Sequence, residues 1–198
     1  MALNMPRIRI TNVRARADLR LERELDMDVL VVAGFERIDD TWAKLTSNDP
    51  RTMCFLWKSP TSKYDAKVEC VLAATGQDAR IGVSRAIALL DSVYPDMRAG
   101  KIAICGAVAK TRACALDLRL LHQLAGSAAD YNPDRFPGLL LYCRKLPGCP
   151  YNTTMMEIFA GGRVNISTFH YDELQLSLSY VYTHLLLAAQ NHEMHYGQ

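Results

Sequence analysis

The sequence predicts an α+β fold in which two pseudo-symmetric repeats form one curved antiparallel sheet, with two long helices on its convex face. Strand-like segments, in which apolar and polar side chains alternate, outnumber helical segments and are separated by short proline or glycine turns. Two longer segments, near residues 84–94 and 172–190, have the periodicity of helices. The same order of segments recurs along the chain, which predicts repeats at residues 1–98 and 99–198.

The first half contains the elements of one repeat. RIRITNVRARADLRL alternates and predicts a half-buried strand, and LDMDVLVVAGF predicts a strand end that enters a short helix. NDPRTMCFLWKS predicts a proline turn followed by a strand, and AKVECVLAATG predicts another strand. GVSRAIALLDSVYPD predicts a helix that begins at a Ser84 cap and ends at Pro95.

The second half repeats this order. KIAICGAVAKTRACALDL is typical of a strand, and LRLLHQLAG predicts a short helix that ends at Gly126. YNPDRFPGLLLYCRK predicts a proline turn into a strand, and TMMEIFAGGRVNIS predicts a hairpin that turns at Gly161 and Gly162. YDELQLSLSYVYTHLLLAAQ predicts a long helix with Asp172 and Glu173 in its first turn, where carboxylates favour the helix dipole.

Two separations along the chain support the repeat. Pro50 and Pro133 each open a proline turn, and Ile81 and Ile166 each end the last strand before a long helix. The two separations are nearly equal, which is typical of two copies of one unit. If both long helices cover one side of the sheet, the other side stays open, and an open apolar sheet face needs a ligand or a partner.

Composition limits the classes of function. The net charge of +2 neither requires nor excludes nucleic acid. The six cysteines form no CxxC pair and lie mostly in apolar runs, which predicts buried free thiols in a reducing compartment. No signal peptide and no membrane-spanning run is recognisable, so we expect a soluble intracellular protein.

No constellation of residues predicts an enzyme. We find no Ser-His-Asp, Cys-His or paired-carboxylate pattern and no glycine-rich phosphate loop, so we expect no catalytic residue and no cofactor. The HEMH motif near the end has the spacing HExH, which differs from the HExxH of zinc sites, and we therefore expect no metal site.

Several motifs resemble one known family. YNPDRFPGLLLYC resembles the Tyr-x-Pro-x-x-Phe-Pro-Gly-Leu segment, and EIFAGGRVNIS the Ile-Phe-x-x-Gly-Lys-Val-Val-x-Thr-Gly hairpin, of the TATA-box-binding protein (TBP) family. ITNVRARADL is similar to its first strand and LDMDVLVVA to its short-helix entry. The likeness covers nearly the whole chain and implies a saddle-shaped, divergent general transcription initiation factor in the nucleus, or at a viral transcription site if the protein is viral. It implies promoter DNA, a TFIIB-like factor and a TFIIA-like factor as partners, with no membrane.

The resemblance also implies a DNA-binding face. In that family, two pairs of phenylalanines wedge between base steps of the minor groove. Phe136, held between two prolines, and Phe159 correspond to one pair, and Met53 and Leu72 stand for the other. Because aliphatic wedges are less rigid than rings, we expect asymmetric bending, strongest at the Phe136 end. The predicted DNA-binding residues are Asn12, Arg14, Arg16, Met53, Leu72, Phe136, Phe159, Asn165 and Ser167.

The resemblance places a partner contact at the turn formed by Asn132, Asp134 and Arg135, where the family faces its TFIIB-type partner. It also implies a monomer, or a weak homodimer through the concave face.

Two alternatives stay open. A large residue at a strand start, such as Phe136, is also typical of a core position. Glu157 and Cys105 stand where the family has leucine and asparagine, and Asn165 and Arg14 stand where it has valine. These changes favour a TBP-fold protein-interaction scaffold with little or no TATA-DNA binding, whereas the two phenylalanines favour DNA binding.

Overall fold

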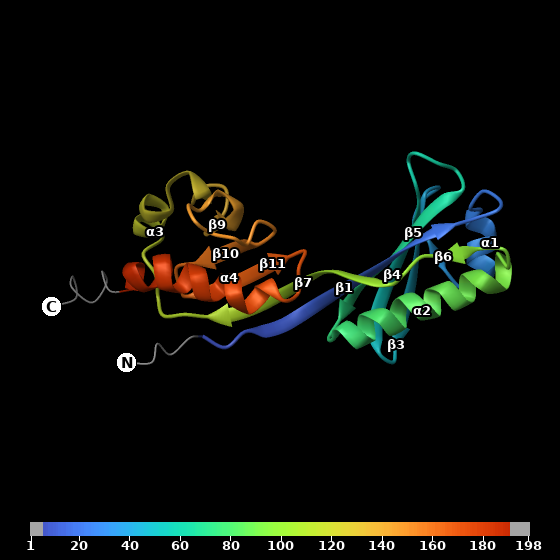
Figure 1. Cartoon of the computed structure of the whole chain (residues 1–198), viewed down its shortest axis with the longest axis horizontal. Helices are drawn as coiled ribbons and strands as arrows, with labels where there is room; N and C mark the ends of the chain where they lie inside the picture. Colours follow the sequence, from blue (N-terminus) through green and yellow to red (C-terminus); the bar gives the residue numbers. More distant parts are fainter. Residues whose placement is uncertain (1–5, 191–198) are drawn as a thin grey trace. The chain divides into compact units, whose positions relative to one another are not determined.

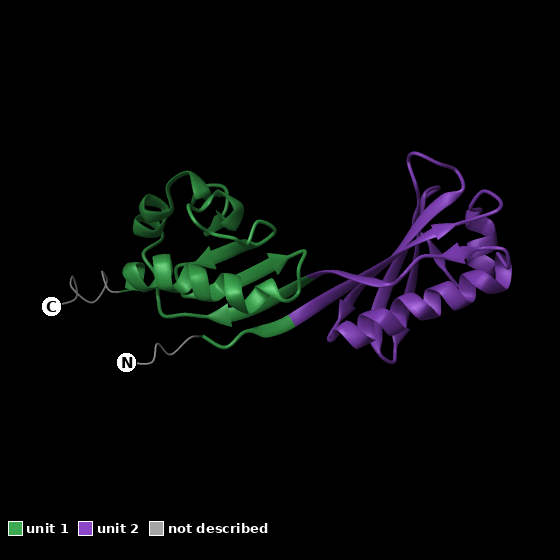
Figure 2. Ribbon diagram, viewed as in Figure 1, with its two compact units in different colours: residues 1–10, 107–198 green, residues 11–106 purple. Residues whose placement is uncertain are grey.

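The computed structural model describes residues 6–190, which divide into two compact units (Figures 1 and 2). Of the described residues, 6–10 and 107–190 form unit 1, and 11–106 form unit 2. Each unit is an antiparallel sheet with a few helices, so the predicted α+β class is confirmed. The saddle and the repeat boundary between residues 98 and 99 stay predictions. The two units are defined by the contacts within each of them, and such contacts do not show that one unit repeats the other.

Unit 2 is a sheet in the order β2-β3-β4-β5-β1, with β6 beside β1. Its helices are α1 (Met27–Val32) and α2 (Gly76–Val93), and α2 packs on β4 and β5 (Figure 1). Within the described residues, its strands are β1 (Arg9–Arg20), β2 (Glu36–Arg37), β3 (Trp42–Asn48), β4 (Arg51–Lys58), β5 (Asp65–Ala73) and β6 (Arg98–Ala99).

The start of α2 differs from the prediction. The helix begins after Thr75, whose hydroxyl accepts a hydrogen bond from the Asp78 backbone N–H at 3.1 Å, and Ser84 is an exposed residue inside it. Ile81 lies in the helix and does not end a strand. The prediction that Ile81 and Ile166 occupy equivalent positions was therefore wrong. Glycine and alanine near the start of α2 interrupt the apolar periodicity by which a helix is recognised in the sequence.

Strand β3 was missing from the prediction. Its residues, Trp42–Asn48, carry lysine, threonine, serine and asparagine, so the sequence indicated only a polar stretch. Pro50 therefore lies in the tight turn between two strands, β3 and β4, whereas Pro133 precedes the first strand of a hairpin. The two prolines therefore precede strands that differ in their place along each unit, and the repeat that their separation suggested stays a prediction.

Unit 1 is a sheet in the order β7-β11-β10-β9-β8. Helix α3 (Leu118–Ala125) has Asp117 as its N-cap and ends at Gly126, and the end at Gly126 is the one predicted. The predicted hairpin at Gly161 and Gly162 joins β10 to β11. Within the described residues, its strands are β7 (Ala103–Arg112), β8 (Ala129–Asp130), β9 (Gly138–Tyr142), β10 (Met155–Phe159) and β11 (Arg163–Thr168).

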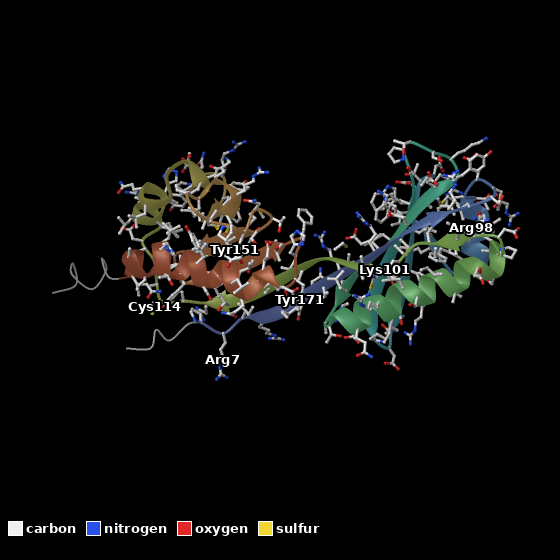
Figure 3. All side chains as sticks on the ribbon, in the orientation of Figure 1. Arg7, Arg98, Lys101, Cys114, Tyr151 and Tyr171 are labelled. Atoms are coloured by element: carbon white, nitrogen blue, oxygen red, sulfur yellow. The ribbon has the colours of Figure 1, made fainter. Side chains whose placement is uncertain are left out.

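The last helical segment of unit 1 is not one regular helix. Helix α4 (Glu173–Val181) packs on β11 and continues into a π-helical turn (Tyr182–Leu186). Figure 3 labels Tyr151, which lies in the loop between β9 and β10 and packs edge-on against Tyr180 of α4, with ring centroids 6.4 Å apart. The segment therefore anchors that loop as well as the sheet.

The described residues bear on two further predictions, those on membrane-spanning segments and on buried cysteines. Among residues 6–190, no helix is long and apolar enough to cross a membrane. All six cysteines are free, but only Cys54, Cys70 and Cys143 are fully buried, and Cys114 is exposed. Burial is the main reason why the pKa of Cys143 is raised to about 12, and the neighbouring Cys149 has a smaller effect in the same direction.

Candidate nucleic-acid interface

Unit 1 buries one face of its sheet and leaves the other half-exposed. On β10, Met156 and Ile158 are fully buried, whereas Met155, Glu157 and Phe159 are half-buried. Strands β9 and β11 alternate in the same way. The open face of unit 1 consists of the half-buried residues Leu140, Tyr142, Met155, Glu157, Phe159, Asn165 and Ser167.

An aromatic pair stands at one end of this open face. The rings of Phe136 and Phe159 meet edge to face, with centroids 5.7 Å apart. Gly138 is the strand partner of Phe159, and a Cβ there would lie 2.7 Å from the Phe136 ring and 3.1 Å from the Phe159 ring. The guanidinium of Arg163 lies 4.0 Å from the centroid of Phe159. Two rings and a cation therefore stand together at the strand end.

The turn before Phe136 sets the position of that ring. The carbonyl of Asn132 accepts hydrogen bonds from the backbone N–H groups of Arg135 and Phe136, at 3.1 and 3.0 Å. The side-chain oxygen of Asn132 accepts a third, from the Asp134 N–H at 3.2 Å. Asn132, Asp134 and Arg135 are all exposed, so the predicted partner residues form the outer surface of the turn that holds Phe136.

A polar row crosses the middle of the open face of unit 1. Glu157 lies between Leu140 and Asn165 in the strand register, and Asn165 lies opposite Lys110 of β7. The side-chain amide of Asn165 donates a hydrogen bond to the Glu157 carboxylate at 2.7 Å. Ser167 lies two residues further along the same face. The structure therefore brings both predicted residues, Asn165 and Ser167, onto the face that carries Phe159.

The predicted polar residues of unit 2 lie on β1. Asn12, Arg14 and Arg16 alternate with fully buried residues of that strand. The guanidinium of Arg14 forms an ion pair with Glu69 of β5 at 3.6 Å, and the Arg14 side chain is 33% exposed. The side-chain oxygen of Asn12 accepts a hydrogen bond from the Leu72 backbone N–H at 2.8 Å. Asn12 and Arg14 are thus held by neighbours, whereas Arg16 is exposed.

Met53 and Leu72 do not correspond to Phe136 and Phe159. Met53 lies in the middle part of β4, opposite Val71, and Leu72 is an exposed residue with a φ of 62°. Met53 was matched to Phe136 by its distance from a proline, as though β3 did not exist, and Leu72 was matched to Phe159 by its place before the Thr75–Gly76 turn, so the strand register gives that correspondence no support. Contact of Met53 and Leu72 with DNA stays a prediction.

The aromatic pair of unit 2 is formed by the two tryptophans of the chain. Trp42 begins β3 and lies opposite Trp57, near the end of β4, with stacked rings whose centroids are 5.0 Å apart. Phe55 adds an edge contact to Trp42, at 6.2 Å. Sequence reasoning missed this pair. The signal that could have found it is the strand-like alternation of TWAKLTSN just before the strand that ends in FLWKS. Antiparallel pairing of these two segments places Trp42 opposite Trp57.

A carboxylate fixes the start of β3. One oxygen of Asp39 accepts hydrogen bonds from the backbone N–H groups of Thr41, at 2.6 Å, and Trp42, at 2.8 Å. These hydrogen bonds hold the pKa of Asp39 below its usual range, and the bond from the Thr41 backbone has the largest effect. The backbone at Trp42 is therefore set by a local turn, as the backbone at Phe136 is set by Asn132.

Other site chemistry is limited in the described part of the chain. Within residues 6–190, no group of three or more His, Cys, Asp or Glu side chains lies close enough to hold a metal ion. The HEMH motif at residues 192–195 lies outside the described residues. Burial, with a smaller effect of Glu69, raises the pKa of the half-buried Cys105.

Of the comparisons with known proteins, only the one with solved structures finds a similar protein, and it bears on the fold. No family model matches the chain, and no curated protein matches its sequence. Among solved structures, the chain is similar to Methanococcus jannaschii TBP, with a TM-score of 0.66 and 19% identity, over 90% of this chain and 97% of that one. This likeness, together with the antiparallel sheet and its helices, shows that the chain has a TBP-like fold.

Proposed function

We propose that the protein is a divergent TBP-like transcription initiation factor that binds promoter DNA in the minor groove. The observation that carries the proposal is that each unit has an aromatic pair at a strand end. Phe136 lies with Phe159 in unit 1, and Trp42 lies with Trp57 in unit 2. Rings of this kind can enter opened base steps, and unstacking one step costs a few kcal/mol, about the amount that a stacked ring returns. The TBP-like fold supports this use of the two pairs.

The two units are, in this proposal, copies of one repeat that together form the saddle. The correspondence runs from Trp42 to Phe136 and from Trp57 to Phe159, in place of the one based on proline turns. In each unit the first aromatic residue stands before or at the start of one strand, and the second stands near the end of the strand that pairs with it. Each unit then carries a pair of rings, so bending at two sites replaces the predicted asymmetry.

Three double variants test the proposal by fluorescence-detected bending and affinity on duplexes that contain A·T-rich runs. We expect Phe136→Ala with Phe159→Ala, and Trp42→Ala with Trp57→Ala, each to lose about half of the bend angle and at least tenfold in affinity, since each removes one wedge. Met53→Ala with Leu72→Ala is the matched control in unit 2 and should keep the tryptophan-dependent bend. A wild-type protein that binds no duplex would contradict the proposal. That result would favour the scaffold alternative.

Recruitment of initiation factors belongs to the same proposal. The exposed turn at Asn132, Asp134 and Arg135 has the position that faces a TFIIB-like factor in the TBP family, and a TFIIA-like factor would bind elsewhere on the nuclear complex. Reversal of both charges, Asp134→Arg with Arg135→Glu, is expected to abolish co-purification of a TFIIB-like factor with the protein–DNA complex. Unchanged co-purification, with DNA binding retained, would remove the turn from the partner interface.

A further inference from the structure

Glu157 is an unusual residue for a surface that meets the minor groove. It lies in the middle of the open face of unit 1 and is half-buried between Leu140 and Asn165. A carboxylate is an acceptor only, with room for about four hydrogen bonds. The amide of Asn165 donates one of them, at 2.7 Å, and thereby orients the carboxylate. The Glu157 side chain thus presents further acceptor capacity to whatever covers this face.

Asn165 adds a second observation. Its side-chain oxygen is buried and has no hydrogen-bond partner among residues 6–190. An amide whose nitrogen is committed to Glu157 cannot turn over to satisfy that oxygen without losing the 2.7 Å bond. Because the Asn165 oxygen is buried, the acceptor that the pair offers is the Glu157 carboxylate, on a face that has Leu140 on one side and Lys110 on the other. Such a site has a deficit of donors, and its ligand is expected to supply one.

The minor groove supplies a donor at one kind of base pair. A·T and T·A pairs present only the acceptors adenine N3 and thymine O2, whereas a G·C pair adds the N2 amino group of guanine. A carboxylate pressed against acceptors alone would be desolvated without a partner, which is unfavourable. The same carboxylate opposite guanine accepts a charge-assisted hydrogen bond.

We infer that Glu157, oriented by Asn165, selects a G·C pair at one position under unit 1. This inference rests on the proposed minor-groove binding and deepens it, because it assigns a base preference to a named side chain. Lys110, opposite Asn165 in the next strand, offsets the repulsion between the carboxylate and the phosphates. The protein therefore reads a mixed site, in which A·T-rich sequence favours bending and one guanine amino group fixes the register.

The test replaces single functional groups of the DNA. A G·C pair is moved through each position of an A·T-rich duplex, and each duplex is compared with its I·C counterpart, which lacks the N2 amino group. We expect about tenfold tighter binding of G·C than of I·C at one position, the usual scale for one base contact. Replacing adenine by 2-aminoadenine at that position should produce a similar gain.

Variants assign the effect to the side chain. Glu157→Leu should equalise the affinities for G·C and I·C at that position or favour I·C. Glu157→Gln keeps an acceptor oxygen and should retain part of the preference. Asp172→Asn removes the same charge from the exposed start of α4 and should leave the ratio of the two affinities unchanged. Circular dichroism and thermal melting confirm that the variants fold.

The outcomes separate the inference from the proposed function. Equal affinities of the wild-type protein for G·C and I·C at every position would overturn the inference and leave minor-groove binding intact. A preference that Glu157→Leu does not change would also overturn it, because another residue would then read the amino group. No binding of the wild-type protein to any duplex would overturn the proposed function, and the inference with it.

Discussion

Gly138 shows how a single residue decides the position of two rings. It lies under both members of the Phe136–Phe159 pair, where a Cβ would come within 2.7 Å of one ring and 3.1 Å of the other. Both contacts are with the outer atoms of side chains, so a methyl group there would displace the rings and leave the strand in place. We therefore expect such a displacement to affect the proposed DNA bending more than the stability of the fold.

We therefore predict that Gly138→Ala reduces DNA bending and lowers affinity several-fold, because the rings lose their common orientation. The free energy of unfolding should change by less than about 1 kcal/mol, since a methyl group near flexible ring atoms can be accommodated. Bending is measured by fluorescence transfer and stability by urea unfolding. Gly161→Ala is the control, because a Cβ at Gly161 has no atom within 4 Å. Loss of bending in both variants would contradict the explanation.

At the scale of elements, the approach of α2 to its sheet depends on Gly82. A Cβ at this position would lie 2.6 Å from the Cys70 sulfur and 3.2 Å from the Thr52 side chain. Both of those residues are buried on strands β5 and β4, so they have little room to move. Gly82 therefore lets the helix pack close to the two strands that carry Trp57 and Glu69 on their other face.

We predict that Gly82→Ala lowers the free energy of unfolding by about 1–3 kcal/mol, the usual cost of overpacking a core. An alanine for glycine inside a helix otherwise stabilises it by about 1 kcal/mol, so the sign of the change identifies the close contact. Gly76→Ala, at the first turn of α2, meets only Ile104 at 3.5 Å and should be neutral or stabilising. Stabilisation by Gly82→Ala in urea unfolding would show that the helix can move away from the sheet at little cost.

At the scale of the whole molecule, charge is distributed by face rather than in excess. The net charge is only +2, yet Arg16, Lys110 and Arg163 lie on or beside the open faces. Arg14 was predicted to contact DNA, but Glu69 already pairs with its guanidinium at 3.6 Å. The exposed Arg16 lies opposite Glu69 in the strand register, but the ion pair of Glu69 is with Arg14, so we expect Arg16 to be the better phosphate ligand of β1.

The salt dependence of DNA affinity should distinguish the two arginines. We predict that Arg16→Ala weakens binding on all sequences and flattens the plot of log affinity against log salt by about 0.9, the value for one phosphate contact. Arg14→Ala should weaken binding, because it exposes the Glu69 carboxylate, with a smaller change in slope. Titrations at several salt concentrations provide the measurement. A larger change in slope for Arg14→Ala would restore the original prediction for that residue.

Alternation and turn residues were enough to predict much of the fold. They located β4, β5, the hairpin at Gly161–Gly162 and the short helix that ends at Gly126, because each depends on neighbours in the chain. The resemblance to the TBP family predicted Phe136 and Phe159 as a pair, and their rings are in contact. These elements are specified by local chemistry, and a structure is not needed to find them.

The sequence by itself determined the α+β class, most of the strands and the resemblance to TBP. Only the tertiary structure decided that Trp42 and Trp57 form the aromatic pair of unit 2, and that Asn165 binds Glu157. Both contacts join different strands, so they depend on the pairing register, which local periodicity does not contain. Because β3 was not recognised, nothing in the sequence placed Trp42 opposite Trp57, and that pairing follows only from the register of β3 with β4.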